Sequence, residues 1–168
     1  MRQIVVAGDS TCSGFALAGG EFHLRRAEAI DLDNEPAENL QAVADAKGVQ
    51  ISDLVVCLLD RPRHAQLVAK VRETGARVRL IIDGDVSGVI ASGLKRNVVD
   101  VYLGIGGAQQ GVLAAAALRC VGAHMQGRLV IRNADDAAKI RAAGIDDPDR
   151  KYSAEDMARG NVTFAATG

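Results

Sequence analysis

Three apolar runs, each followed by a polar loop and a helical pattern, constrain the fold of this chain most strongly. They read LVVCLLD from Leu54, RVRLIID from Arg77 and VVDVYLG from Val98. The first has no polar alternation, which is typical of a strand covered on both faces. Strands that alternate with helices indicate βαβ units, so the sequence predicts an α/β fold: a layered α/β/α domain with a mostly parallel sheet. We expect residues 1–168 to form a single domain.

Other segments extend this pattern on either side of the three units. A helix is predicted for NEPAENLQAVADAKG, with Asn34 as a candidate cap, Pro36 in the first turn and Gly48 at the end. IVVAGDS near the N-terminus predicts a strand followed by a polar turn. The remaining predicted elements are helices at VSGVIASGL, DDAAKIRAAG and SAEDMARG, a strand at GRLVIR from Gly127, and a last strand at NVTFAATG.

Composition argues against several classes of partner. The net charge is −1 without a basic stripe, and there are three Phe, two Tyr and no Trp, so we expect no nucleic acid partner. No apolar run reaches the roughly 20 residues of a membrane span, so we expect no membrane partner. The cysteines at 12, 57 and 120 lack the spacing of a zinc site or a disulfide framework, which predicts reduced thiols in the cytoplasm.

The loops after the three apolar runs carry the chemistry of a binding site. They read DRPRH (60–64), DGD (83–85) and GIGG (104–107). Ligands of parallel sheets bind beyond the carboxyl ends of the strands, so these loops should lie together. Arginines offer forked donors to phosphate, aspartates accept from hydroxyls or hold a metal, and glycines let backbone amides approach an anion. The combination predicts a site for a phosphorylated polyol.

Each of these residues also has a purely structural interpretation. Asp83 and Asp85 could serve as turn and cap residues, and the arginines at 61 and 63 could be solvated beside a proline that starts a helix. His64 lies on the apolar side of its predicted helix, where a histidine is more often a hydrogen-bonded packing residue than a base. The glycines could serve only close packing of helix on strand. The coincidence of all three loops at one sheet edge favours a ligand site.

From about Ile30 onward the sequence resembles the C-terminal half of class II fructose-1,6-bisphosphatases, a family that includes bifunctional fructose and sedoheptulose bisphosphatases. The resemblance is carried by long stretches with few gaps, and residues 1–29 form a divergent N-terminal segment. It implies a sugar-phosphatase fold and a metal-dependent hydrolase of carbohydrate metabolism, including gluconeogenesis. The matching stretches are IDLD, DRPRHAQLVAKVRETGARVRLIIDGDV, VDVYLGIGGAQQGVLAAAALRCVGAHMQGRLVIRN, GIDDPDRKYSAEDMARG and FAATG.

The resemblance also implies roles for individual residues. The substrate contacts of the family correspond to Arg61, Pro62, Arg63, Asp83, Gly84, Asp85 and Gly107. The family loop reads GIGGAPEG, and its glutamate is a ligand of Mg²⁺ or Mn²⁺; Gln110 stands in that place. An amide oxygen lacks the charge that holds a hard cation tightly, so we expect metal binding to be weak or absent here.

The family's N-terminal half, with its other acidic metal ligands, has no counterpart in this sequence. We therefore expect either a partner chain that supplies those ligands or a homo-oligomer. The alternating residues 21–29 could form a strand at the sheet edge. The segment IVVAGDSTCSG also resembles the first block of GDSL hydrolases, with Ser10 as the nucleophile, but that chemistry needs a late Asp and His, whereas the histidines are His23, His64 and His124. Plainer interpretations are a polar turn, or a phosphate contact from Ser10, Thr11 and Ser13.

Three hypotheses follow for the function. In the first, the chain is the sugar-phosphate-binding half of a metal-dependent sugar bisphosphatase and is not hydrolytic alone. In the second, it is a non-catalytic module that senses a phosphosugar or binds another protein. In the third, an enzyme of another class reuses the crevice, with Asp83, Asp85, His64 or Ser10 in acid–base work.

Overall fold

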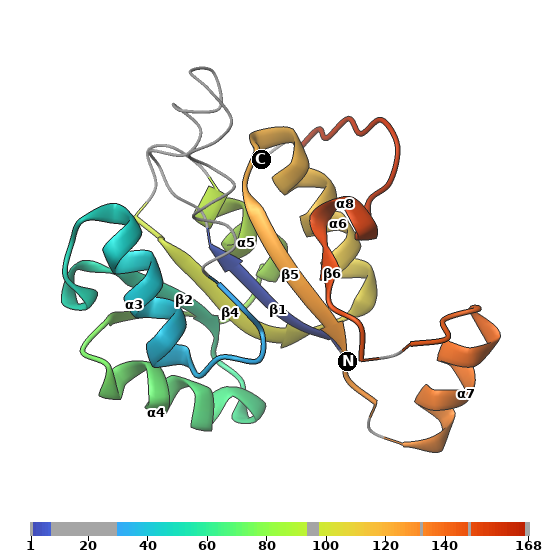
Figure 1. The fold of residues 1–168 in the computed structure, drawn as a ribbon, viewed down its shortest axis with the longest axis horizontal. Helices are drawn as coiled ribbons and strands as arrows, with labels where there is room; N and C mark the ends of the chain where they lie inside the picture. The colour runs from blue at the N-terminus through green and yellow to red at the C-terminus, as the bar shows by residue number, and fades with distance from the viewer. Residues whose placement is uncertain (1, 8–29, 94–97, 132, 148, 167–168) are drawn as a thin grey trace.

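The computed structural model describes residues 2–7, 30–93, 98–131, 133–147 and 149–166. These residues contain one mixed sheet whose strand order is β3-β2-β4-β1-β5-β6 (Figure 1). The strands are β1 Arg2–Ala7, β2 Val55–Leu59, β3 Arg77–Ile81, β4 Val101–Gly106, β5 His124–Leu129 and β6 Tyr152–Ser153. The three predicted apolar runs thus form β2, β3 and β4.

Parallel pairing is confined to the three strands of the predicted βαβ units. β2 pairs parallel with β3 and with β4, as the sequence predicts. β1 lies between β4 and β5 and is antiparallel to both, and β6 is antiparallel to β5. β2, β3 and β4 therefore form the parallel part of a mixed sheet, and the predicted α/β class is confirmed. The antiparallel insertion of β1 was not predicted.

Helices cover both faces of the sheet and give the predicted α/β/α layers. Alternate β2 residues contact opposite layers: Val56 and Leu58 pack in a cluster with side chains of α3 and α4, whereas Cys57 packs in another with side chains of α5, α6 and α8. α7 extends away from both layers (Figure 1) and has no buried residue. The helices are α3 Pro36–Lys47, α4 Ala65–Glu73, α5 Asp85–Gly93, α6 Ala108–Val121, α7 Ala134–Ala142 and α8 Ala154–Met157, with short 3₁₀ turns η1 Ile51–Asp53 and η2 Pro62–His64.

The ends of α3 show how the sequence specifies a helix. Pro36 occupies the first turn, and Gly48 ends the helix in the left-handed conformation with φ 67°. The predicted cap Asn34 is wrong: Glu35 is the N-cap residue and forms a capping box with Glu38. Asn34 instead directs its side-chain amide toward Asn39, 3.5 Å away.

The predicted C-terminal strand is also wrong. Residues 161–166 have no strand conformation, and the last strand of the described chain is the two-residue β6. Side chains of α6 bind the main chain here: Arg119 donates to Gly160 O, just before this segment, at 2.7 Å, and the Cys120 thiol donates to Val162 O within it at 3.7 Å. These bonds hold residues 160 and 162 against α6 rather than beside a strand.

Several sequence-based hypotheses fall outside the described residues. They concern Ser10, Thr11, Cys12, Ser13 and the edge strand proposed for 21–29. Within the described part of the chain, no helix combines the length and the apolar character needed to span a membrane.

Candidate functional site

The carboxyl ends of β2, β3 and β4 meet at one edge of the sheet, as the sequence predicts. Leu59 is in register with Ile81, and Asp60 N donates to Ile81 O at 2.8 Å, so the loops after β2 and β3 start side by side. β4 lies on the other side of β2 and leads through Gly107 into α6. The three loops that carry the predicted binding residues therefore surround one edge.

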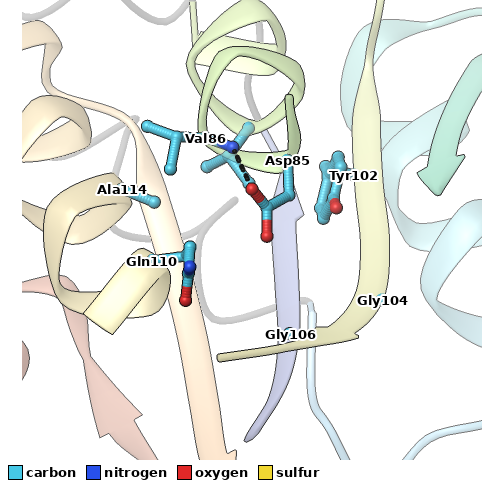
Figure 2. A pocket seen from close by; sticks show the side chains of 8 residues that line it. Asp85, Val86, Tyr102, Gly104, Gly106, Gln110 and Ala114 are labelled. Atoms are coloured by element: carbon cyan, nitrogen blue, oxygen red, sulfur yellow. Dashed lines mark hydrogen bonds between the residues drawn. The ribbon is translucent and has the colours of Figure 1, made fainter. Parts of the chain in front are cut away.

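A small pocket opens between the starts of α5 and α6 at this edge (Figure 2). It is a shallow hollow: the space of about 240 Å³ within it includes open solvent, and the enclosed part has room for about one water molecule. The described residues therefore form one wall of a site and would leave a sugar bisphosphate partly uncovered. The lining residues are Asp85, Val86, Val89, Tyr102, Gly104, Gly106, Gln110 and Ala114.

Asp85 contributes the carboxylate of the pocket from the first turn of α5. The turn before it depends on Gly84, whose φ of 82° is left-handed and whose carbonyl accepts from Gly88 N at 2.9 Å. Asp85 Oδ1 accepts from Val86 N at 3.0 Å. Its Oδ2 faces β4, because a Cβ placed on Gly106 would lie 3.4 Å from that oxygen. One carboxylate oxygen is thus held by the helix and the other is directed into the pocket.

Gln110 contributes the neutral amide on the opposite side of the pocket. It lies in the first turn of α6, for which Gly107 is the N-cap residue. A Cβ on Gly107 would overlap Gln110 Oε1 and would lie 3.1 Å from Cδ. The missing side chain at position 107 therefore leaves the space in which the carboxamide of Gln110 lies.

Tyr102 forms a wall of the pocket that the sequence analysis did not identify. Its side chain is 3% exposed, and burial raises the pKa of the phenol, with the nearby Asp85 carboxylate adding to the increase. Tyr102 is therefore a neutral hydroxyl at the base of the site. Strand alternation offered a signal, because Tyr102 shares the face of β4 that Gly104 and Gly106 present to the pocket.

Arg63 reaches the site through the main chain of β4. Its Nε donates to Ile105 O at 2.9 Å, and Ile105 directly precedes Gly106. Within the described chain, this bond leaves both terminal guanidinium nitrogens of Arg63 available, and two such nitrogens suit a phosphate group. His64 is fully buried, and both of its ring nitrogens bind main-chain groups, which agrees with its interpretation as a packing residue rather than a base.

The other predicted residues lie at the same edge but do not line the pocket. Arg61 donates from Nη1 to Asp60 O at 3.0 Å within its own loop, and Pro62 is exposed in η2. Asp83 is exposed, and its Oδ1 accepts from Gly84 N at 2.8 Å, as expected of a turn residue. Asp85, Gly107 and Gln110 thus lie close together around the pocket, and Arg63 is connected to them through its bond to Ile105. The roles of all these residues as substrate contacts stay predictions.

The metal predicted from the resemblance does not fit the donors of this pocket. The lining residues offer one carboxylate, Asp85, and one amide oxygen, Gln110. Mg²⁺ and Mn²⁺ require about six oxygen ligands, with carboxylates supplying the charge. Among the residues that the structure describes, no three His, Cys, Asp or Glu side chains are grouped so that they could hold a metal ion.

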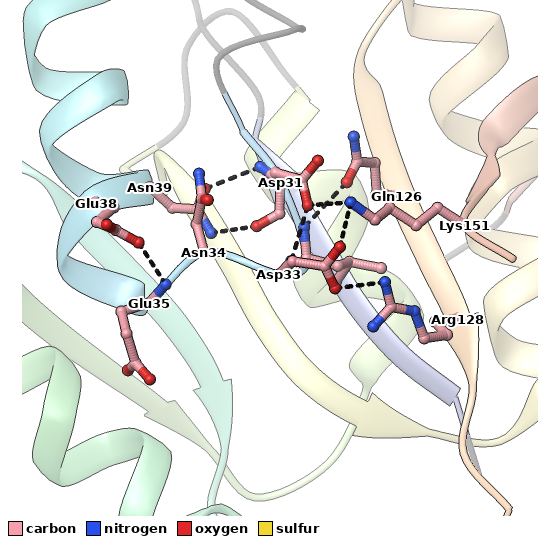
Figure 3. Close-up of polar contacts among 10 residues, drawn as sticks. Asp31, Asp33, Asn34, Glu35, Glu38, Asn39, Gln126, Arg128 and Lys151 are labelled. Atoms are coloured by element: carbon pink, nitrogen blue, oxygen red, sulfur yellow. Dashed lines mark hydrogen bonds and ion pairs between the residues drawn. The ribbon is translucent and has the colours of Figure 1, made fainter. Parts of the chain in front are cut away.

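A separate polar cluster lies on the other side of the sheet, at the segment before α3 (Figure 3). Lys151 pairs with Asp31 and, at 2.6 Å, with Asp33, which Arg128 also binds at 2.5 Å. The hydrogen bonds from Lys151 hold the pKa of both aspartates below the ordinary value, with Arg128 also acting on Asp33. The cluster ties this segment to β5 and to the loop before β6, and its charges are paired with one another.

Comparisons with known proteins identify the family of this chain. The family model described as bacterial fructose-1,6-bisphosphatase, glpX-encoded, matches residues 21–168. A protein of Synechococcus sp. (strain JA-3-3Ab), named D-fructose 1,6-bisphosphatase class 2/sedoheptulose 1,7-bisphosphatase, is 41% identical over 152 residues, which cover 83% of this chain and 44% of the relative. A protein of the same name from Crocosphaera subtropica is 37% identical over 175 residues, which cover 92% of this chain and 51% of the relative.

These matches agree with the resemblance seen in the sequence. The chain spans about half the length of the curated relatives that it matches. The matched residues include every predicted site residue from Arg61 to Gln110. This chain therefore belongs to the class II fructose-1,6-bisphosphatase family.

Proposed function

We propose that this chain is the sugar-phosphate-binding half of a class II fructose-1,6-bisphosphatase-like phosphatase and does not hydrolyse its ligand alone. The ligand class is a bisphosphorylated ketose of the fructose 1,6-bisphosphate or sedoheptulose 1,7-bisphosphate type, which the names of the relatives suggest. The observation that carries the proposal is the convergence of Asp85, Gln110 and the Arg63 loop at one sheet edge in a segment that matches the family.

The chemistry of these groups suits such a ligand. Asp85 Oδ2 accepts hydrogen bonds from sugar hydroxyls, and the carboxamide of Gln110 can both donate and accept. Arg63 supplies two parallel N–H donors for a phosphate. The pocket is a shallow wall rather than an enclosed cavity, so a partner chain or a second copy would supply the remaining walls and the acidic ligands for Mg²⁺ or Mn²⁺.

A second candidate function is a non-catalytic module that senses a phosphosugar or binds another protein. The neutral Gln110 supports it, because an amide can hold a hydroxyl without a metal. A different enzyme class with His64 as the base has less support, since both nitrogens of that ring are already bonded to main-chain groups. We also propose that 1–168 is one domain and that the protein acts in the cytoplasm, where the thiols of Cys57 and Cys120 would stay reduced.

The experiment is a calorimetric titration of the full chain with fructose 1,6-bisphosphate, with and without Mn²⁺, followed by a phosphate-release assay. We expect binding without phosphate release. Arg63→Ala should weaken binding by roughly 10- to 100-fold, as expected for a lost charge-assisted hydrogen bond. Arg72→Ala, an exposed arginine on α4, is the matched control and should leave binding unchanged. Phosphate release by the chain alone would refute the non-hydrolytic part, and absence of binding would refute the ligand class.

Gln110→Glu separates the phosphatase half from the sensing module. If the loop of Gln110 is a corner of a metal site that a partner completes, the added carboxylate should strengthen Mn²⁺ binding by the full chain. Calorimetry with Mn²⁺ alone measures this. No gain in Mn²⁺ affinity would argue against the metal-site alignment and in favour of the metal-free module.

A further inference from the structure

Two neighbouring side chains of η2 hold both main-chain groups of one residue in β4. Ile105 N donates to His64 Nε2 at 2.9 Å, and Ile105 O accepts from Arg63 Nε at 2.9 Å. Ile105 lies directly before Gly106 and Gly107, the loop that starts α6. The Arg63 loop and the glycine loop are therefore connected through a single residue.

This connection replaces main-chain pairing that β2 does not provide. The parallel register of β2 and β4 consists of Val56 with Val101 and Cys57 with Tyr102, and β2 ends at Leu59. Ile105 lies beyond that register. Side chains from the residues that follow β2 thus satisfy the main-chain donor and acceptor of Ile105.

The bonding pattern fixes the chemical form of His64. Nδ1 lies 2.9 Å from Leu59 O, an acceptor, so Nδ1 carries the proton. Nε2 receives the Ile105 N–H, so Nε2 is unprotonated and serves as an acceptor. The ring is fully buried, and a Cβ on Gly104, which lines the pocket, would lie only 3.5 Å from its Cε1. His64 therefore links the end of β2 to the pocket wall in a single orientation.

We propose that His64 is a positioning residue that holds the glycine loop, and with it the first turn of α6 and Gln110, in place relative to Arg63. His64 does not contact the ligand, because the pocket is lined by other residues and both ring nitrogens are bonded. The expected effect of His64 on sugar-phosphate binding rests on the proposed function. The expected effect of His64 on the position of the glycine loop does not.

Two substitutions separate the two bonds of the ring. The side-chain amide of His64→Asn occupies the position of Nδ1 and keeps the bond to Leu59 O, but it is too short to accept from Ile105 N. The longer His64→Gln brings its amide oxygen to the position of Nε2 and keeps the acceptor for Ile105 N. We expect His64→Gln to retain sugar-phosphate binding and His64→Asn to weaken it by roughly 5- to 30-fold.

The matched control is Asn39, a buried side chain that also bonds both main-chain groups of one residue but lies away from the pocket. Asn39 is 4% exposed; its Oδ1 accepts from Asp31 N at 2.9 Å, and its Nδ2 donates to Asp31 O at 2.8 Å (Figure 3). Asn39→Leu should lower stability, as His64→Asn should, but leave ligand affinity unchanged. Equal weakening of binding by Asn39→Leu and His64→Asn would show general destabilisation and overturn the proposal.

Nuclear magnetic resonance tests the bond between His64 and Ile105 in the free protein, so the result does not depend on the ligand. In the wild-type chain we expect a ¹⁵N–¹⁵N coupling across the hydrogen bond between Ile105 N and His64 Nε2, and an imidazole protonated at Nδ1. In His64→Asn, but not in His64→Gln, the amide signals of Gly106 and Gly107 should shift. If the coupling is absent in the wild type, the proposal fails even where sugar phosphate binds. If the coupling is present and no sugar phosphate binds, the proposed function fails and the positioning role of His64 stands.

Discussion

Gly107→Ala tests why the loop before α6 needs a glycine. The backbone at this residue has φ −72° and ψ 152°, which alanine adopts without strain. Alanine is a poorer N-cap residue than glycine, but it loses less backbone entropy on folding, so the two effects offset each other to within about 1 kcal/mol. Thermal and urea unfolding should therefore show a nearly unchanged free energy of unfolding.

Ligand binding should respond much more strongly than stability. The new Cβ would overlap Oε1 of Gln110 and lie 3.1 Å from its Cδ, so the carboxamide must leave the space above the loop. Under the proposed function, each hydrogen bond from Gln110 to a sugar hydroxyl would contribute about 1 kcal/mol. Losing one or two of them should raise the Kd for fructose 1,6-bisphosphate by roughly 5- to 30-fold in a calorimetric titration.

A double-mutant cycle with Gln110→Ala decides between two roles for the glycine. If Gly107 serves to make room for Gln110, then Gly107→Ala should have no further effect in the Gln110→Ala background. If Gly107 instead lets the backbone approach the ligand, it should weaken binding equally in both backgrounds. Equal weakening in both backgrounds would refute the reasoning from the position of the carboxamide.

Three further predictions concern stability. Gly84→Ala should lower the free energy of unfolding by about 1–3 kcal/mol in urea, since φ is 82° and a Cβ would lie 2.7 Å from Ser87 Oγ. Asp100→Ala should cost about 1–3 kcal/mol, because Asp100 Oδ2 accepts from Val55 N at 2.7 Å; Asp100→Asn keeps an acceptor and should recover most of the loss. Burial lowers the pKa of the His124 imidazole below 6.5, and the nearby Glu155 carboxylate opposes this shift. The unfolded chain therefore binds the proton more readily, so the free energy of unfolding should fall as pH drops below about 6.5. His124→Gln should flatten this part of the pH profile.

The fold was predictable where local pattern decides it. The unbroken apolar run at β2 predicted a strand buried on both faces, and all five of its residues are buried. Local pattern was misleading at NVTFAATG: its described residues 161–166 form no strand, and Cys120 of α6 donates to the main chain of Val162 instead. Strand propensity becomes a strand only where a partner with free donors and acceptors is available.

The candidate site was predictable to the level of its loops but not of its side chains. The carboxyl-end rule for parallel strands brought the loops of Arg63, Asp85 and Gln110 to one edge, because that rule depends only on strand order and direction. It did not distinguish Asp85, which lines the pocket, from Asp83, which bonds within its own turn. That distinction depends on the left-handed turn at Gly84, which sets the direction of each carboxylate.

The position of β1 shows why part of the architecture lies beyond local pattern, and it bears directly on the site. β4 and β5 both pair with β1, so in the described part of the chain the two halves of the sheet are joined by residues that precede the family match at residue 21. In this register Arg2 lies opposite Gly106 and Gln3 opposite Ile105. The end of β4 is therefore fixed on one side by the main chain of β1 and on the other by His64 and Arg63. A glycine loop, which has few side chains of its own to pack, keeps its position because the residues before it are held from both sides.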